Sequence, residues 1–172
     1  MSSLADSELF LEIAELAVAF AGFASIASAM RDRADVDNIR VDAGRLTNMI
    51  IVSLTTAMLS LVPFIPMLFS VQATTTWRAS AFVAIAAVLT AGPGMVERTI
   101  RMKNYREFNM QTNVVNYGIA MIAAGAFLAC ALGYPAGNPA ASYATGLVAL
   151  LLMSAILFFR VIVSLLRPHV PE

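Results

Sequence analysis

The protein has one histidine, one cysteine and one lysine among its 172 residues, and only 13% of its residues are charged. His169 lies beyond the last long apolar run and Cys130 lies inside another, so no histidine-based metal motif or assisted nucleophile is present within the apolar sequence. Glycine-rich phosphate loops and basic segments interleaved with aromatic residues are also missing. The sequence therefore predicts no enzyme, no catalytic residue, no metal site, no cofactor and no nucleic-acid partner.

Apolar sequence dominates the chain, since 59% of its residues are hydrophobic. Five long apolar runs approach the roughly 20 residues that a helix, rising about 1.5 Å per residue, needs to cross about 30 Å of hydrocarbon. The segments between these runs are too short to fold as separate domains. The sequence predicts an all-α integral membrane protein whose residues 1–172 form one membrane domain. The five spans are expected at about 9–30, 46–71, 79–96, 114–134 and 143–166.

The net charge is zero, but the basic residues are distributed unevenly along the chain. If the spans alternate in direction, ten of the eleven basic residues fall on one side and Arg78 alone falls on the other. Because segments rich in lysine and arginine stay in the cytoplasm, the N-terminus is expected outside and the C-terminus inside. The expected location is the lipid bilayer of a bacterial cytoplasmic membrane, as a multi-pass protein. The ten basic residues are Arg31, Arg33, Arg40, Arg45, Arg98, Arg101, Lys103, Arg106, Arg160 and Arg167.

Three carboxylates recur in the first apolar run at spacings of four and then three residues. Glu8, Glu12 and Glu15 therefore share one face of a helix. A carboxylate at hydrocarbon depth is costly unless it faces water, a cation or a partner, so this face is the candidate functional site. A second face of the same helix consists of small residues that favour close packing against neighbouring helices. These small residues are Ala14, Ala17, Ala21, Ala24 and Ser28.

The carboxylate face predicts a cation pore built from several copies of the chain. Rings of glutamate attract cations in known channels, and a repeat of about 3.5 residues keeps one helical face along a common axis. A homo-oligomer and an inorganic cation are the partners that this hypothesis requires. The cation pathway would consist of Glu8, Glu12 and Glu15. The constriction that follows it would consist of Ala19, Gly22 and Ile26.

The alternative is a non-conducting accessory or structural subunit of a membrane complex. In that case the carboxylates would form ion pairs with Arg78 or with a basic group of a partner protein. Arg78 is the candidate within the chain because it is the one basic residue expected on the outer side. The sequence is compatible with both interpretations.

Proline and glycine mark two candidate hinges. Pro63 and Pro66 remove backbone donors near the end of the second span, so they are expected to kink or end its helix. Gly92, Pro93 and Gly94 are expected to end the third span and to let its inner end bend.

Overall fold

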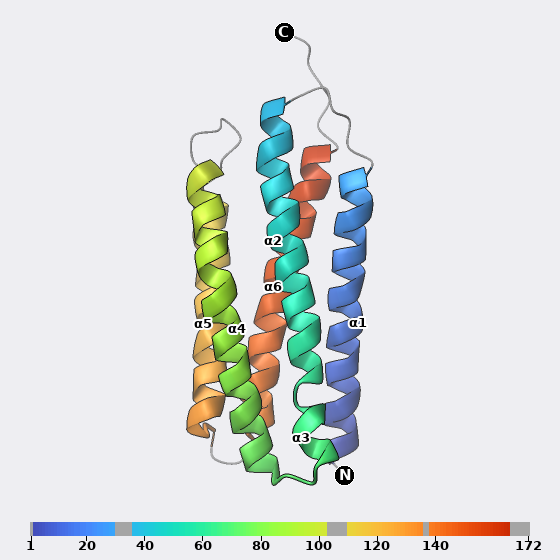
Figure 1. The fold of residues 1–172 in the computed structure, drawn as a ribbon, viewed down its shortest axis with the longest axis vertical. Coiled ribbons are helices and arrows are strands. Elements are labelled where there is room, and N and C mark those ends of the chain that lie inside the picture. Colours follow the sequence, from blue (N-terminus) through green and yellow to red (C-terminus); the bar gives the residue numbers. More distant parts are fainter. Residues whose placement is uncertain (1, 30–35, 103–109, 136–137, 166–172) are drawn as a thin grey trace.

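The computed structural model describes residues 2–29, 36–102, 110–135 and 138–165. These residues form six helices and no strand, and the chain enters and leaves the bundle at opposite ends (Figure 1). The helices are α1 (Ser2–Ala29), α2 (Val36–Leu61), α3 (Phe64–Leu68), α4 (Ala73–Met102), α5 (Met110–Leu132) and α6 (Pro139–Leu165).

Five segments are long and apolar enough to cross a membrane, which confirms the all-helical class expected from the sequence. The third segment exceeds the expected 79–96 because α4 continues through Gly92, Pro93 and Gly94 to Met102. The end expected at these residues is therefore wrong. A proline inside a helix removes one donor, but the neighbouring turns keep their own bonds. The five segments are Glu8–Ala27, Ala43–Leu68, Ala73–Arg101, Asn113–Leu132 and Pro139–Val163.

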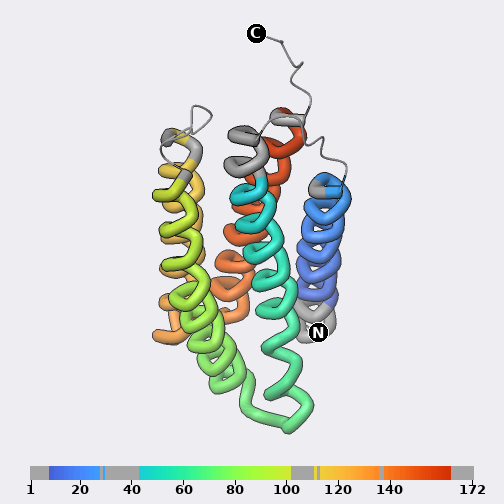
Figure 2. The backbone as a smooth tube through the Cα atoms, turned by 45° about the horizontal axis from the view of Figure 1, so that its top comes forward, coloured from blue at the N-terminus to red at the C-terminus, as the bar shows by residue number. Residues whose placement is uncertain are grey.

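The bundle has α2 and α6 packed together at its centre. Helix α1 covers both on one side, and α4 and α5 lie on the other side (Figures 1 and 2). We call the end that holds Arg45 and Arg160 the arginine end, and the end that holds Trp77 and Tyr143 the aromatic end. Of the ten basic residues expected on the cytoplasmic side, the structure describes the side chains of four. All four lie at the arginine end. The four are Arg45, Arg98, Arg101 and Arg160.

Helix α1 packs on the bundle through its small face. Ala24 and Ala27 lie in one buried cluster with Leu46 of α2 and Leu157 of α6. Small side chains allow this close approach of three helices. The opposite face of α1 is left outside the bundle. The buried side chains of α1 are Phe10, Ile13, Ala14, Ala17, Ala21, Ala24 and Ala27.

Tyr143 of α6 is the centre of the aromatic end. Its ring is fully buried and lies 6.0 Å from the ring of Phe10, 5.9 Å from that of Trp77 and 5.3 Å from that of Phe127, measured between centroids. These rings come from α1, α4 and α5. The ring of Phe10 also lies 5.4 Å from that of Trp77, so aromatic contacts with α4 and α6 hold the first part of α1 in position.

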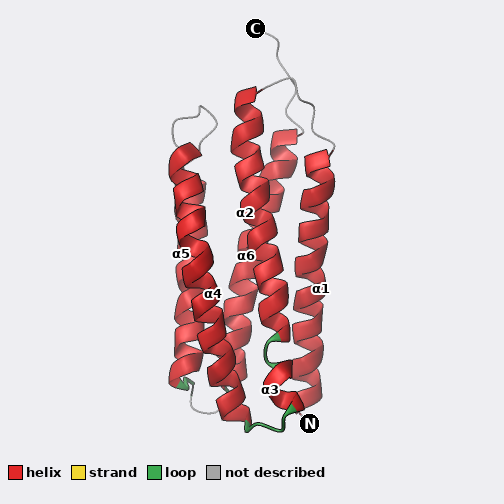
Figure 3. Ribbon diagram, in the orientation of Figure 1, coloured by secondary structure: helices red, strands yellow, loops and turns green. Residues whose placement is uncertain are grey.

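The hydroxyl of Tyr143 also donates a hydrogen bond at the end of α2, where the helix is interrupted. The helix ends at Leu61, and Pro63 follows directly before α3, so the interruption expected at Pro63 and Pro66 is present (Figure 3). Pro63 has no N–H to donate to the carbonyl of Leu59, four residues earlier. The hydroxyl of Tyr143 donates to that carbonyl instead, at 2.7 Å. One buried side chain thus joins α6 to α2 as well. A hinge motion at these prolines stays a prediction.

Candidate functional site

The three carboxylates of α1 lie on the face that points away from the bundle. Glu8, Glu12 and Glu15 are all exposed, whereas the small face opposite them is buried against α2 and α6. In the part of the chain that the structure describes, no hydrogen bond or ion pair engages any of the three. An ion pair lies at the arginine end, where Arg101 Nη2 is 2.6 Å from Glu97 Oε1.

The exposed face continues beyond the carboxylates. Ala19 and Gly22 are exposed, and Ile26 is 56% exposed. A Cβ atom added at Gly22 would meet no described atom within 4 Å, so another helix has room to approach this face closely. We call the whole face the acidic stripe. It consists of Glu8, Glu12, Glu15, Ala19, Gly22 and Ile26.

The acidic stripe lies within a segment that could cross a membrane. This segment begins at Glu8 and ends at Ala27. Glu15 is seven residues from its start, which corresponds to about 10 Å along a helix. Among the described residues, no three acidic, histidine or cysteine side chains converge where they could hold a metal ion.

Arg78, the candidate ion-pair partner, lies beside the end of α5. Gly133 ends this helix with φ +82°, and the N–H groups of Gly133 and Tyr134 donate to the carbonyls of Cys130 and Ala129 at 2.9 and 2.8 Å. A Cβ atom at Gly133 would lie 2.7 Å from Nη2 of Arg78. The guanidinium group thus complements the negative end of the α5 dipole. An ion pair with Glu8, Glu12 or Glu15 is not among the described contacts.

Replacement of Gly133 by alanine is expected to lower the free energy of unfolding by about 1 kcal/mol, because an L-residue is strained at positive φ. The added methyl group would also displace Arg78. Denaturant unfolding in micelles, followed by the fluorescence of Trp77, measures the change. Gly125→Ala is the matched control, since a Cβ atom there would meet no described atom within 4 Å. Equal stability of the two variants would contradict the role assigned to Gly133.

A second group of polar side chains lies buried at the arginine end. Arg45 and Asn48 of α2 are 8% and 6% exposed, and Asn116 of α5 is 4% exposed. Arg98 of α4 donates from Nη1 to Oδ1 of Asn48 at 2.8 Å. The amide oxygen of Asn116 has no hydrogen-bond partner among the described residues. A polar cavity of about 30 Å³ lies here, and its lining includes Arg45, Asn48, Asn116 and Arg160.

No pattern in the sequence predicted this polar cavity. Its residues come from several helices, and each polar residue stands near the border of an apolar run. One signal was present in the sequence. Arg45 and Asn48 are three residues apart, as are Asn113 and Asn116, and residues at this spacing share a helical face.

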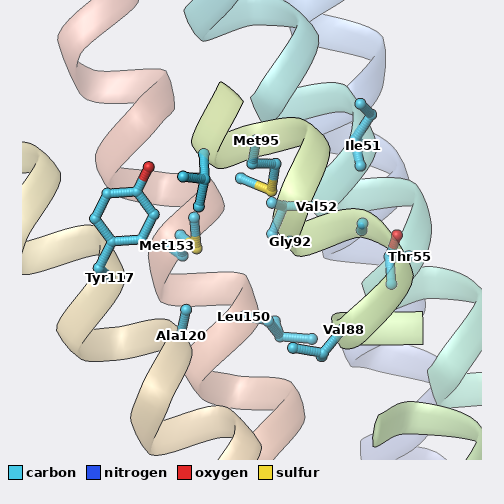
Figure 4. A pocket seen from close by; sticks show the side chains of 12 residues that line it. Ile51, Val52, Thr55, Val88, Gly92, Met95, Tyr117, Ala120, Leu150 and Met153 are labelled. Carbon is cyan, nitrogen blue, oxygen red and sulfur yellow. The ribbon is translucent and has the colours of Figure 1, made fainter. Parts of the chain in front are cut away.

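An apolar cavity of about 110 Å³ adjoins the polar cavity toward the middle of the bundle (Figure 4). The two cavities share Met95, Tyr117 and Met153 as lining residues. Gly92, a candidate hinge residue in the sequence, lines the apolar cavity, and a Cβ atom there would meet no described atom within 4 Å. Helices α2, α4, α5 and α6 all contribute to the wall.

The chain matches no protein-family profile, no curated protein and no solved structure. Two chemically different regions of the structure therefore bear on function. One is an exposed acidic stripe on α1, and the other is a buried, basic and amide-rich cavity that continues into an apolar one. These regions lie on different sides of α2 and α6, so they can be tested independently.

Proposed function

We propose that the protein is a multi-pass membrane protein whose copies assemble around α1 and conduct cations along the acidic stripe. The observation that carries this proposal is the exposure of Glu8, Glu12 and Glu15 on a segment able to cross a membrane. Carboxylates in such a position require a polar or cationic environment that a single copy does not supply among its described residues.

Insertion into a bilayer is supported by the outer surface of the bundle. Large apolar side chains are exposed on every long helix, and a soluble monomer rarely exposes continuous apolar patches of more than a few hundred Å². The basic residues at the arginine end favour a cytoplasmic position for that end, with the N-terminus outside. A bacterial cytoplasmic membrane is the location we propose. Examples of the exposed side chains are Leu16 53%, Met58 70%, Phe82 63%, Met121 73% and Phe159 68%.

Assembly through α1 follows from the position of the carboxylates. If a single copy were surrounded by lipid, Glu15 would face hydrocarbon, which costs at least several kcal/mol for a charged group. A ring of copies would instead turn this face toward a central aqueous path. The exposed backbone at Gly22 allows the α1 helices of neighbouring copies to approach closely on the arginine-end side of the carboxylates.

Conduction would use the order of residues along the stripe. Successive rings of Glu8, Glu12 and Glu15 would concentrate cations at the outer mouth. The path would then narrow where the side chains become small or apolar. That constriction would consist of Ala19, Gly22 and Ile26.

Cross-linking between copies tests the assembly. Cysteine placed at Gly22 in a Cys130→Ala background is expected to cross-link to its neighbour in native membranes through a short bis-maleimide, because packed helices lie about 8–10 Å apart. Gly118→Cys is the matched control, since Gly118 is exposed and open on α5, on the other side of the bundle. Absence of cross-linking at Gly22, or equal cross-linking at both positions, would contradict assembly around α1.

The accessory-subunit alternative predicts a different result in the same experiment. A partner protein that supplies a basic group to the carboxylates would cover the stripe, so Gly22→Cys would cross-link to a chain of another mass, or not at all in the purified protein. Electrophoresis of the cross-linked product distinguishes these outcomes from a product with twice the mass of the chain.

A further inference from the structure

We infer that the arginine end binds an anionic phospholipid, with a hydroxyl of the head group in the polar cavity, the phosphate beside Arg45 and Arg160, and part of one acyl chain in the apolar cavity. The inference rests on the proposed insertion of the bundle into a bilayer, but not on the cation pathway. Its occupant is a membrane lipid whose head group carries a phosphate and a free hydroxyl, as phosphatidylglycerol does.

The two cavities form adjoining compartments of opposite polarity. Tyr117 lines both, and its ring lies along the apolar cavity while its hydroxyl points toward the arginine end (Figure 4). Met95 and Met153 also line both cavities. Methionine side chains adapt readily to the shape of a neighbouring chain. An amphiphile could therefore extend from one compartment into the other without crossing a polar barrier.

The polar cavity, of about 30 Å³, has room for one or two polar groups of a lipid, and its lining suits a hydroxyl and a phosphate oxygen. Arg45 and Arg160 line it, and each guanidinium has five donors, so each can hold a phosphate oxygen while keeping its contacts within the chain. Asn116 lines the same cavity, is nearly fully buried and has an unbonded amide oxygen. A buried acceptor without a donor is unfavourable, and a lipid hydroxyl would satisfy it.

The position of the cavities along the bundle matches the orientation of a lipid. Arg45 is two residues from the start of the segment Ala43–Leu68, and Arg160 is three residues from the end of Pro139–Val163. These positions correspond to the level of the head groups, where basic residues attract anionic lipids. The apolar cavity reaches Val88 on α4. Val88 is ten residues from Arg98, or about 15 Å deeper along the helix, in the direction of an acyl chain.

The apolar cavity also has the size and the access that an acyl chain needs. A water molecule needs only about 10–15 Å³ of such space, but the cavity is about 110 Å³ and its wall is almost entirely carbon and sulfur, which disfavours water. Helix α4 diverges from α2 toward the arginine end (Figures 1 and 2). Ile51, Thr55 and Val96, from these two helices, are partly exposed at the rim, so a chain could enter from the side.

Native mass spectrometry of the purified full chain in a neutral detergent tests the site. Phosphatidylglycerol is expected to bind roughly tenfold more tightly than phosphatidylcholine with the same acyl chains, because the arginines and Asn116 recognise its charge and hydroxyl. Glycerol phosphate, which lacks the chains, should bind far more weakly than the lipid. Equal binding of the two lipids would overturn head-group recognition. Binding of glycerol phosphate as tight as that of the lipid would show an anion site without a chain site.

Two variants separate the compartments. Gly92→Leu should weaken phosphatidylglycerol binding at least about tenfold, because the added side chain fills the apolar cavity. Gly92→Val is the smaller change if the leucine variant does not fold. Gly118→Leu, at an equally open glycine outside the cavity, is the matched control and should bind as the wild type does.

Asn116→Ala tests the polar compartment. It should reduce the preference for phosphatidylglycerol over phosphatidylcholine while keeping the binding of the chain. Wild-type binding by both Gly92→Leu and Asn116→Ala would overturn the inference. None of these results depends on cation flux, so failure here and failure of the proposed pore are distinguishable.

Discussion

Replacement of Glu15 by glutamine is expected to lower cation flux roughly tenfold, because a ring of like charges in a narrow path raises the local cation concentration by at least that factor. Glutamine keeps the size and shape of glutamate but removes the charge. Glu15 is the carboxylate closest to the proposed constriction, so its ring acts where the path begins to narrow. Potassium efflux from proteoliposomes, together with the reversal potential in a potassium chloride gradient, measures flux and selectivity.

Two further variants serve as controls for this result. Glu8→Gln should lower flux less, about twofold, because Glu8 lies nearer to water and its field is screened by salt. Glu97→Gln removes an acid at the arginine end, where the exposed pair with Arg101 contributes little to stability, so flux should be unchanged. Unchanged flux in Glu15→Gln, or no flux from assembled wild-type protein, would exclude the cation pathway and leave an accessory role.

The helical class of this protein could be predicted from its sequence because long hydrophobic runs identify the segments that must be kept out of water. The five runs became five long helices, and the break near Pro63 was visible because proline removes a donor at a known position. The extent of α4 was not predictable in the same way. A glycine or proline within an apolar run can either end a helix or be carried through it, and at Pro93 the helix continues.

The two candidate sites differ in how far sequence could reveal them. The acidic stripe belongs to a single helix, so its periodicity placed Glu8, Glu12 and Glu15 on one face, and the structure leaves that face exposed. Whether it lines a pore stays a prediction. The polar cavity is assembled from separate helices, and no local pattern predicts that Asn48 and Asn116 line the same cavity. Only tertiary packing brings them together.

The hydrogen bond between Tyr143 and Leu59 could not be predicted from the sequence for the same reason, although the need for a donor to Leu59 could. Pro63 leaves the carbonyl of Leu59 without its usual donor, which predicts that some other donor must be found. The residue that supplies it is 84 positions away in the chain. The missing donor can thus be predicted from the local sequence, but the residue that replaces it cannot. Tyr143 also contacts the ring of Phe10 on α1.

Replacement of Tyr143 by phenylalanine is therefore expected to lower the free energy of unfolding by about 2 kcal/mol, because it leaves a buried carbonyl without a donor while keeping the ring. Denaturant unfolding in micelles, followed by the single tryptophan, reports the loss directly, since the ring of Trp77 lies 5.9 Å from that of Tyr143. Tyr134→Phe is the control. Tyr134 is 71% exposed, so the free energy of unfolding of this variant should change little.

A second substitution decides whether the missing backbone donor is the cause. Pro63 has φ −63° and ψ −24°, values that alanine adopts without strain, and the N–H of an alanine there could donate to Leu59. In a Pro63→Ala background, Tyr143→Phe should cost less than about 1 kcal/mol, because the carbonyl then has a donor from its own helix. An equal loss of stability in both backgrounds would show that Tyr143 acts through ring packing or another contact, and that the interrupted end of α2 does not depend on its hydroxyl.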